Sequence, residues 1–304
     1  MHTGNKNMTD YSSSNSAPGP NDGQAVLDRS IGDIIGETRN LSAEQVENIL
    51  AKQKEKGIRF GEAAVELGYV SVDDVLFALA QQFHYPYAPQ ERRQVSPELV
   101  AFNDPFSRQA ESFRAIRSQL IMRVFNDASA IRKALAVVSP NSGDGKTFVA
   151  ANLAVALAQL GGRTLLVDAD MRSPRQHEVF KLSNNGGLSG ILSGRAENQV
   201  VQQVQGVPSL FVLPVGITPP NPLELVERPA FGLLIKELVG KFDHVVVDTP
   251  ADERGSDAMV IAARCGAAMV VARKHRARLP TLEQMTKNLQ VACGDLAGVM
   301  LNEY

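Results

Sequence analysis

The sequence is poor in the residues that mark several classes of protein. It has no tryptophan, and its 304 residues include only 5 tyrosines and 2 cysteines, Cys265 and Cys293. Two cysteines cannot build a disulfide framework, which is typical of a reducing cytosol. No apolar run approaches the roughly 18 residues of a membrane-spanning helix, and the polar start lacks the apolar core of a secretory signal. We therefore expect a cytoplasmic protein without direct membrane insertion.

The chain also lacks a strong charge of either sign. Its formal net charge is −2, so no overall field attracts nucleic acid or anionic lipid. We expect no nucleic-acid partner, and we expect any role at a membrane to come through a partner protein. The length is sufficient for two domains with buried cores.

The sequence divides into four segments. Residues 1–26 are rich in Ser, Asn, Gly and Pro, which predicts a disordered tail. Residues 27–88 contain a repeat, because "SIGDIIGETRNLSAEQVENILAKQ" and "RFGEAAVELGYVSVDDVLFALAQQ" match at an offset of 29 residues. This repeat predicts a small helical domain with helix caps at Ser42 and Ser71. Residues 89–104 are predicted to form a linker, and residues 105–304 a second domain.

In the second domain, apolar runs alternate with helical stretches. Runs without polar alternation predict strands that are buried on both faces of a parallel sheet. The predicted strands are 134–140, 163–170, 209–216, 242–250, 266–273 and 296–304, and clear helices include 147–160 and 281–292. The fold class is therefore α/β, a parallel sheet with helices on both faces, plus a small mainly helical N-terminal domain. Ligands of such sheets bind at the carboxyl ends of strands.

The segment "SPNSGDGKT", residues 139–147, follows one such strand and precedes a helix. This is the context of a phosphate-binding loop, although Pro140 stands where the usual pattern has its first glycine. Backbone N–H groups at a helix start bind phosphate, and the lysine and threonine of the pattern serve the terminal phosphates and Mg²⁺. We therefore predict an ATP and Mg²⁺ site. Its predicted binding residues are Ser142, Gly143, Asp144, Gly145, Lys146, Thr147 and Phe148.

Three carboxylates follow two other strands. Asp168 and Asp170 end the run "LLVDAD", and Asp248 ends "VVVD". One carboxylate at a strand end is often only a helix cap, but three of them after a phosphate loop favour a Mg²⁺–nucleotide site. We predict that Asp248 holds Mg²⁺ through water, and that Asp168 or Asp170 orients a nucleophile or accepts its proton. The predicted catalytic residues are Lys146, Asp168, Asp170 and Asp248, and the predicted metal ligands are Thr147, Asp168 and Asp248.

These motifs resemble the Walker A, A′ and B motifs of the bacterial tyrosine kinases, and the resemblance covers roughly residues 100–304. An early proline in the loop is usual in that family, whereas partition-type ATPases carry a lysine at the position of Asn141. The segment "PPNPLELV" (residues 219–226) is a further family mark. The resemblance implies an ATP-dependent, autophosphorylating protein tyrosine kinase that regulates the chain length or export of an exopolysaccharide. It also implies a partner, a membrane chain-length determinant (polysaccharide co-polymerase) that recruits the kinase to the inner membrane.

A predicted helix over residues 107–125 carries the segment "ESFRAIR". Glu111, Arg114 and Arg117 lie on its polar face, which on composition alone is a solvated surface. The segment is similar to the E-x-x-R-x-x-R motif that joins subunits of the kinase family. The resemblance therefore implies that these three residues form the interface of a homo-oligomer.

One departure from the family keeps a second function open. The family usually ends in a cluster of tyrosines, but the kinase part here contains only Tyr304, which is thus the one candidate phosphorylation site in that part. The alternative is a nucleotide-switched ATPase assembly factor, related to the division and partition ATPases and without protein kinase activity, that docks on a membrane co-polymerase. We interpret the basic segment 272–278 as a solvated loop.

Residues 27–87 are similar to the N-terminal domain of type II secretion and type IV pilus assembly ATPases. A variant of that domain binds cyclic di-GMP through two copies of an Arg-Leu-Gly-type motif, and Arg59, Gly61 and Gly68 stand where that variant has Arg, Gly and a later Gly. The first repeat departs from the motif, since Ser30 replaces the arginine and Arg39 the later glycine. We favour protein docking over cyclic di-GMP binding for this domain.

Overall fold

The structure is a computed structural model, and it describes residues 30–82, 95–125, 132–195 and 199–303. The chain divides into two compact units, residues 1–83 and residues 84–304, and each is described by itself. The tail predicted over residues 1–26, the first part of the predicted linker and Tyr304 lie outside the described residues.

The described residues of the smaller unit form four helices. They are α1 (Ile31–Arg39), α2 (Ala43–Lys56), α3 (Phe60–Glu66) and α4 (Val72–Gln82). Helix α1 packs on α4, and α2 packs on α3. The core is formed mainly by Ile35, Ile49 and small residues such as Ala63, Ala64 and Ala78, which allow the short helices to approach closely.

The sequence repeat corresponds to two helix pairs, α1–α2 and α3–α4. Ser42 caps α2 through the N–H of Gln45, whose side chain returns a bond to the backbone of Ser42. Ser71 and Asp74 form the same reciprocal contact before α4. Reciprocal caps satisfy N–H groups that a helix start otherwise leaves unpaired. The predicted caps are therefore confirmed at both positions.

The larger unit contains a seven-stranded sheet. The strands are β1 (Ala134–Val138), β2 (Thr164–Asp168), β3 (Gln202–Gln203), β4 (Leu210–Leu213), β5 (His244–Asp248), β6 (Gly266–Arg273) and β7 (Asp295–Asn302). Their order is β3-β4-β2-β5-β1-β6-β7. All neighbours are parallel except β3, which pairs antiparallel to β4. The chain leaves β1 toward β2 on one side and reaches β6 on the other, so the loop after β1 opens at a topological switch point, where sheets of this type bind ligands.

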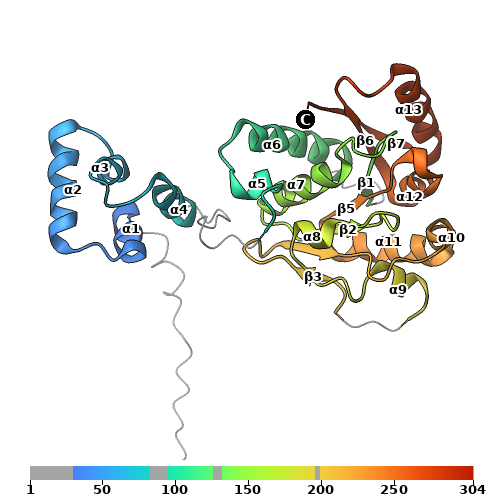
Figure 1. Ribbon diagram of the computed structural model, residues 1–304, viewed down its shortest axis with the longest axis horizontal. Coiled ribbons are helices and arrows are strands. Elements are labelled where there is room, and N and C mark those ends of the chain that lie inside the picture. Colours follow the sequence, from blue (N-terminus) through green and yellow to red (C-terminus); the bar gives the residue numbers. More distant parts are fainter. Residues whose placement is uncertain (1–29, 83–94, 126–131, 196–198, 304) are drawn as a thin grey trace, which may run out of the picture. The chain divides into compact units, whose positions relative to one another are not determined.

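Helices cover both faces of this sheet (Figure 1). They are α5 (Val100–Asn103), α6 (Arg108–Leu120), α7 (Lys146–Ala158), α8 (Gln176–Val179), α9 (Leu188–Leu192), α10 (Pro222–Glu227), α11 (Pro229–Lys241), α12 (Asp257–Cys265) and α13 (Leu279–Cys293). A π-helical turn, η2 (Ile121–Phe125), continues α6, and a 3₁₀ turn, η3 (Asp252–Arg254), follows β5. Helices α5, α6 and α7 pack on one face, and α10 to α13 pack on the other.

A hydrophobic core lies on each face of the sheet, and successive residues of a strand point alternately into one core and the other. In β1, Leu135 and Val137 belong to the core under α7, whereas Ala136 and Val138 belong to the core under α12. The predicted uninterrupted apolar strands are confirmed, because a strand covered on both faces needs apolar side chains at every position. Helix α7 is itself buried along most of its length.

Residues 95–103 differ from the predicted linker. They include α5, and Leu99 and Phe102 are buried in the core of the larger unit. The Asn152 side chain of α7 accepts from Ala101 N at 2.9 Å and donates to Glu98 O at 2.9 Å, which fastens this segment to the fold. Among the described residues, no helix combines the length and apolar character that a membrane span requires.

Candidate nucleotide-binding site

The predicted phosphate loop lies between the end of β1 and the start of α7. The backbone at Gly143 and Gly145 has φ values of +80° and +99°. Side chains other than glycine rarely adopt this left-handed region, so both glycines are required by the path of the loop. Helix α7 begins at Lys146 with Gly145 as its N-cap. Its first N–H groups are therefore directed into the loop, as phosphate binding requires.

Pro140 stands at the position of the first glycine of the common pattern, and the side chain of Asp144 closes the loop by bonding to Asn141. Its buried carboxylate accepts from Asn141 N at 2.9 Å and from the Asn141 side chain at 3.3 Å. Pro140 is buried, and its carbonyl accepts from Glu253 N at 3.0 Å. Proline thus replaces glycine without breaking the loop, because the turn is made at Asn141 and Asp144.

Lys146 is buried and donates to Ser139 Oγ at 3.0 Å. Burial lowers the pKa of this lysine, and the negative charge of Asp248 opposes that shift. Thr147 follows at the start of α7. The ring of Phe148 packs edge-on against Phe113 of α6, with ring centroids 5.8 Å apart. Among the predicted binding residues, Phe148 therefore has a packing role that the sequence did not indicate.

Asp168 ends β2 and is fully buried. Its two carboxylate oxygens accept three backbone N–H groups, from Asp170 at 3.2 Å, Arg175 at 3.1 Å and Gln176 at 3.0 Å. Asp170 is slightly exposed and accepts from the backbone of Arg172 and Ser173. Asp168 therefore fixes the path of the chain after β2, and Asp170 is the more accessible of the two carboxylates.

Asp248 ends β5 in register with Asp168 on β2. Its Oδ2 accepts from the Gln176 side chain at 2.8 Å. Within the described part of the chain, its Oδ1 is buried and has no hydrogen-bond partner. A carboxylate oxygen of this kind is suited to a metal ion or to a water on a metal ion. Gln176 was not identified from the sequence, where a single amide after a strand carries no recognisable pattern.

Burial makes ionisation of both aspartates costly, and neighbouring carboxylates add to the cost. Burial is the main cause that raises the pKa of Asp168 well above its usual value, and the charge of Asp248 adds to it. Burial also raises the pKa of Asp248 to about 6, although the Gln176 hydrogen bond and the charge of Lys146 lower it. The pair therefore favours a cation that lets both carboxylates ionise.

The described residues hold no group of three or more His, Cys, Asp or Glu side chains that could bind a metal on their own. A metal here would need ligands from the nucleotide as well as from the chain, as is usual for Mg²⁺. The orphaned Oδ1 of Asp248 and the adjacent Thr147 fit that requirement. Thr147 and Asp248 would hold the ion, and it would supply positive charge at the terminal phosphates.

Several residues that the sequence reading did not assign surround the loop. Glu253 accepts from Ser142 N at 2.7 Å, and Arg254 donates to Ser142 Oγ at 3.3 Å. Arg273 donates to Gly143 O at 3.2 Å, and Asn302 donates to Asp144 O at 3.0 Å. A pocket of about 320 Å³ adjoins them, lined by Asn141, Arg276, Arg278 and Thr281.

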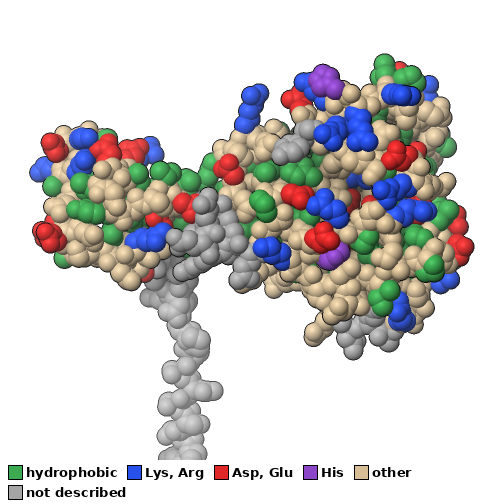
Figure 2. All heavy atoms as spheres, viewed as in Figure 1, with side chains coloured by type: hydrophobic (Ala, Val, Ile, Leu, Met, Phe, Trp, Pro, Cys, Tyr) green, Lys and Arg blue, Asp and Glu red, His purple; other side chains and the backbone are tan. Residues whose placement is uncertain are grey.

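The basic segment 272–278 is therefore not simply a solvated loop, because it contacts the phosphate loop. The sequence could not reveal this contact, which is made by strand ends that are distant in the chain. Figure 2 shows Lys and Arg side chains gathered at several places on the face of the larger unit seen in that view.

The three residues of the predicted oligomer interface lie on α6. Arg114 pairs with Glu111 at 2.7 Å and donates to Pro105 O at 2.6 Å. Arg117 is half-buried and donates to Ala156 O of α7 at 2.9 Å. Both arginines thus contribute to the fold of the unit itself, which the polar pattern of α6 did not indicate.

Comparisons with known proteins agree with this geometry. Residues 135–304 match the family described as the CobQ/CobB/MinD/ParA nucleotide binding domain. CapB of Staphylococcus aureus is 34% identical over 214 residues, which cover 70% of this chain and 92% of CapB. The tyrosine-protein kinase CpsD of Streptococcus agalactiae is 32% identical over 64% of this chain and 82% of CpsD. The chain belongs to the bacterial tyrosine-protein kinases.

Solved structures of this kinase family have the same fold. The kinase domain of the Escherichia coli tyrosine kinase ETK aligns with a TM-score of 0.64 and 32% identity over 69% of this chain and 81% of that chain. The septum site-determining protein MinD of Pyrococcus horikoshii, complexed with Mg-ADP, aligns with a TM-score of 0.50 and 28% identity over 57% of this chain and 70% of that chain. Some matching tyrosine-protein kinases are longer, and the chain spans 27% of the length of one and 29% of another.

The pKa of Asp248 predicts a pH dependence of metal-assisted nucleotide binding. Below about pH 6 Asp248 is mostly protonated, and ionisation above that pH creates the charge that attracts Mg²⁺. The Mg²⁺ concentration that half-saturates the protein–ADP complex should therefore fall as pH rises from about 5 to about 7, by up to roughly tenfold per unit. A Mg²⁺ titration at fixed ADP, followed by calorimetry, measures this dependence.

Asp248→Asn is the matched control, because the phosphate of ADP also titrates near pH 6. The difference in slope between the two proteins isolates the contribution of Asp248. Equal slopes for the wild type and Asp248→Asn would contradict the assignment.

Proposed function

We propose that this chain is an ATP-dependent protein tyrosine kinase that phosphorylates itself and regulates the chain length or export of an exopolysaccharide. The observation that carries the proposal is a complete phosphate loop opposite two buried aspartates in a chain from the tyrosine-kinase family. The reaction converts ATP and a protein tyrosine to ADP and phosphotyrosine. The MinD relative with Mg-ADP supports ATP and Mg²⁺ as the cofactors.

In this mechanism, a tyrosine hydroxyl oxygen forms a bond to the γ-phosphorus while the bond to the β–γ bridging oxygen breaks. ADP leaves with the electron pair of that bond. The hydroxyl proton passes to a carboxylate, and Asp170 is favoured over Asp168 because Asp168 is fully buried and accepts three backbone N–H groups. Lys146 and the N–H groups at the start of α7 stabilise the charge on the phosphates.

The acceptor tyrosine is proposed to be Tyr304, which lies outside the described residues. Two features support this choice. Asn302 at the end of β7 contacts the phosphate loop, and Glu303 pairs with Lys274 at 2.8 Å. Asn302, two residues before Tyr304, therefore lies against the phosphate loop.

A second function, the nucleotide-switched assembly factor, rests on the single tyrosine in the kinase part. It shares the nucleotide site but needs no acceptor tyrosine. Two observations weigh against it. Asn141 occupies the position of the partition-type lysine and bonds to Asp144 instead of reaching outward. The relative CpsD is also a tyrosine-protein kinase rather than a partition protein.

Replacement of Lys146 tests the nucleotide site directly. Lys146→Met should reduce ATP turnover by about 10²–10³-fold, since a charged group that stabilises the transition state is lost. Circular dichroism and thermal unfolding should show an intact fold. Lys236→Met, an exposed lysine on α11, is the matched control and should keep full turnover. Unchanged turnover in Lys146→Met would remove the lysine from the mechanism.

The proposal includes a homo-oligomer joined through α6, by analogy with the family motif. Exposed Glu111 and half-buried Arg114 offer charged groups that can clamp a carboxylate or guanidinium of a neighbouring copy. The bonds from Arg114 to Pro105 O and from Arg117 to Ala156 O mean that substitutions here also weaken the subunit itself. A stability measurement must therefore accompany any measurement of size.

Arg114→Ala combined with Arg117→Ala should shift the protein from oligomer to monomer, because the charged clamp between subunits is lost. Light scattering with ATP and Mg²⁺ present measures the mass. Arg108→Ala, at the first residue of the same helix, serves as control and should leave the oligomer intact. A wild type that is monomeric with ATP and Mg²⁺ present would exclude the interface.

The smaller unit is proposed to dock a protein partner, and we favour the membrane chain-length determinant. This arrangement would be that of the cytoplasmic EpsG-type kinases, with an N-terminal domain like that of secretion and pilus ATPases. A membrane partner would recruit the kinase from the cytoplasm to the inner membrane.

Three features of the smaller unit argue against a cyclic di-GMP site at Arg59, Gly61 and Gly68. A Cβ at Gly61 would lie 2.6 Å from Val75 Cγ1, so this glycine serves the packing of α3 on α4. Gly68 has a φ of +71°, which a turn after α3 explains. In the first repeat, Arg39 is paired with the buried Asp74 at 2.7 Å and is committed to the fold.

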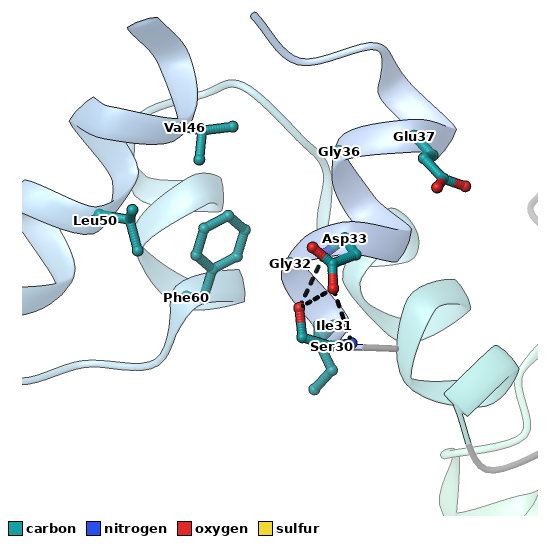
Figure 3. Close-up of a pocket in the computed structure, with 9 residues that line it drawn as sticks. All are labelled: Ser30, Ile31, Gly32, Asp33, Gly36, Glu37, Val46, Leu50 and Phe60. Atoms are coloured by element: carbon teal, nitrogen blue, oxygen red, sulfur yellow. Dashed lines mark hydrogen bonds between the residues drawn. The ribbon is translucent and has the colours of Figure 1, made fainter. Parts of the chain in front are cut away.

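The pocket of this unit also differs in chemistry from a phosphate site. It has a volume of about 750 Å³ and lies between α1, α2 and α3. Figure 3 shows Val46, Leu50 and Phe60 facing Gly32 and Gly36. The charged side chains that line it are the carboxylates Asp33 and Glu37, which repel a phosphodiester. This lining supports a protein or apolar occupant over a cyclic dinucleotide.

Calorimetry of the full chain with cyclic di-GMP tests this preference. We expect no binding at micromolar concentrations, for the reasons of packing and charge given above. Arg59→Ala is the specificity control, since Arg59 is exposed at the start of α3. Micromolar binding that is lost in Arg59→Ala would overturn the docking proposal and assign a second-messenger site.

A further inference from the structure

A buried glutamine joins the three motifs of the nucleotide site. Gln176 is fully buried at the start of α8. Its Nε2 donates to Asp248 Oδ2 at 2.8 Å and to Thr147 O at 3.2 Å, and its backbone N–H donates to Asp168 Oδ2 at 3.0 Å. One residue thus contacts the start of α7, the end of β2 and the end of β5.

The orientation of this amide is determined by its partners. Asp248 Oδ2 and Thr147 O are both acceptors, so the NH₂ group must face them. The reverse orientation would direct the amide oxygen at a carboxylate and a carbonyl, which is repulsive. Oε1 therefore points away from these two acceptors, and it is buried without a hydrogen-bond partner among the described residues.

Among the described residues, three buried acceptors of the site thus lack a donor: Oε1 of Gln176, Oδ1 of Asp248 and Oδ1 of Asp144 in the phosphate loop. Buried polar atoms of proteins are nearly always hydrogen-bonded, so buried acceptors without a donor inside a ligand site are the atoms expected to contact the ligand. The phosphates of a nucleotide carry no donor. Water bound to Mg²⁺ does, and Mg²⁺ in proteins usually keeps several of its waters.

We propose that Gln176 is a positioning residue of the Mg²⁺ site. Its Nε2 holds the Asp248 carboxylate in one orientation, and its Oε1 accepts a hydrogen bond from a water of the metal ion. This inference rests on the proposed Mg²⁺–nucleotide function and adds a residue to it. An apolar side chain of the same size would fill the space equally well, but it could neither hold Asp248 nor accept from a metal-bound water.

The test compares nucleotide binding with and without metal in the full chain. Gln176→Met keeps the length of the side chain and removes the amide. A fluorescent ADP analogue is titrated first with EDTA and then with increasing Mg²⁺. We expect wild-type affinity in EDTA, because the phosphate loop is unchanged. The gain in affinity on adding Mg²⁺ should fall by at least about tenfold, which is typical for loss of a group that orients a metal ligand.

Asn152→Met is the matched control for the loss of a buried amide. Asn152 is also fully buried, but it bonds to Glu98 O, Ala101 N and Phe148 O and not to the carboxylates. This variant should unfold at a lower temperature and keep the full effect of Mg²⁺. If Gln176→Met does not fold, Gln176→Asn replaces it. The shorter amide cannot reach both acceptors, and it should lose part of the Mg²⁺ effect.

The outcomes separate the two claims. A wild type whose affinity for the ADP analogue does not respond to Mg²⁺ would overturn the proposed function itself. A normal wild-type response that persists unchanged in the folded Gln176 variant would overturn only the role of Gln176. Loss of the response in Asn152→Met as well would assign the effect to general destabilisation, which also contradicts the inference.

Discussion

The nucleotide site depends on one electrostatic constraint, the burial of two aspartates at neighbouring strand ends. Asp168 and Asp248 are partners in the register of β2 and β5, and neither is exposed. Two like charges this close are unfavourable in a protein interior unless donors or cations compensate them. Backbone N–H groups compensate Asp168, while Gln176 and the charge of Lys146 compensate Asp248. The compensation is incomplete on the side where a metal and phosphates would bind.

The sheet topology creates this constraint and also makes it useful. Because β1 lies between β5 and β6, the phosphate loop opens beside Asp248 on one side and beside the ends of β6 and β7 on the other. Arg273 and Asn302, from those two strands, reach the backbone of the loop. Positive charge from the loop, from Lys146 and from the basic segment thus converges on a region bounded by carboxylates. That distribution suits a triphosphate with a divalent cation.

The parts of this arrangement that follow local rules were predictable from the sequence. Uninterrupted apolar runs identified six of the seven strands, and reciprocal Ser–acid or Ser–amide spacing identified the caps of α2 and α4. The two-residue strand β3 was missed because its Gln202 and Gln203 carry no apolar pattern. Gln176 and the contacts of the basic segment were missed for a different reason. They depend on which strand ends become neighbours, and one sequence contains no record of that.

The central claim is that the site transfers phosphate to tyrosine and does not only hydrolyse ATP. The most direct measurement is mass spectrometry for phosphotyrosine on purified protein incubated with ATP and Mg²⁺, alone and with the cytoplasmic segment of the membrane partner. The account predicts phosphotyrosine on the wild-type chain, at Tyr304, that increases with time. ATP hydrolysis without phosphotyrosine on either protein, under both conditions, would contradict the account and favour the assembly factor.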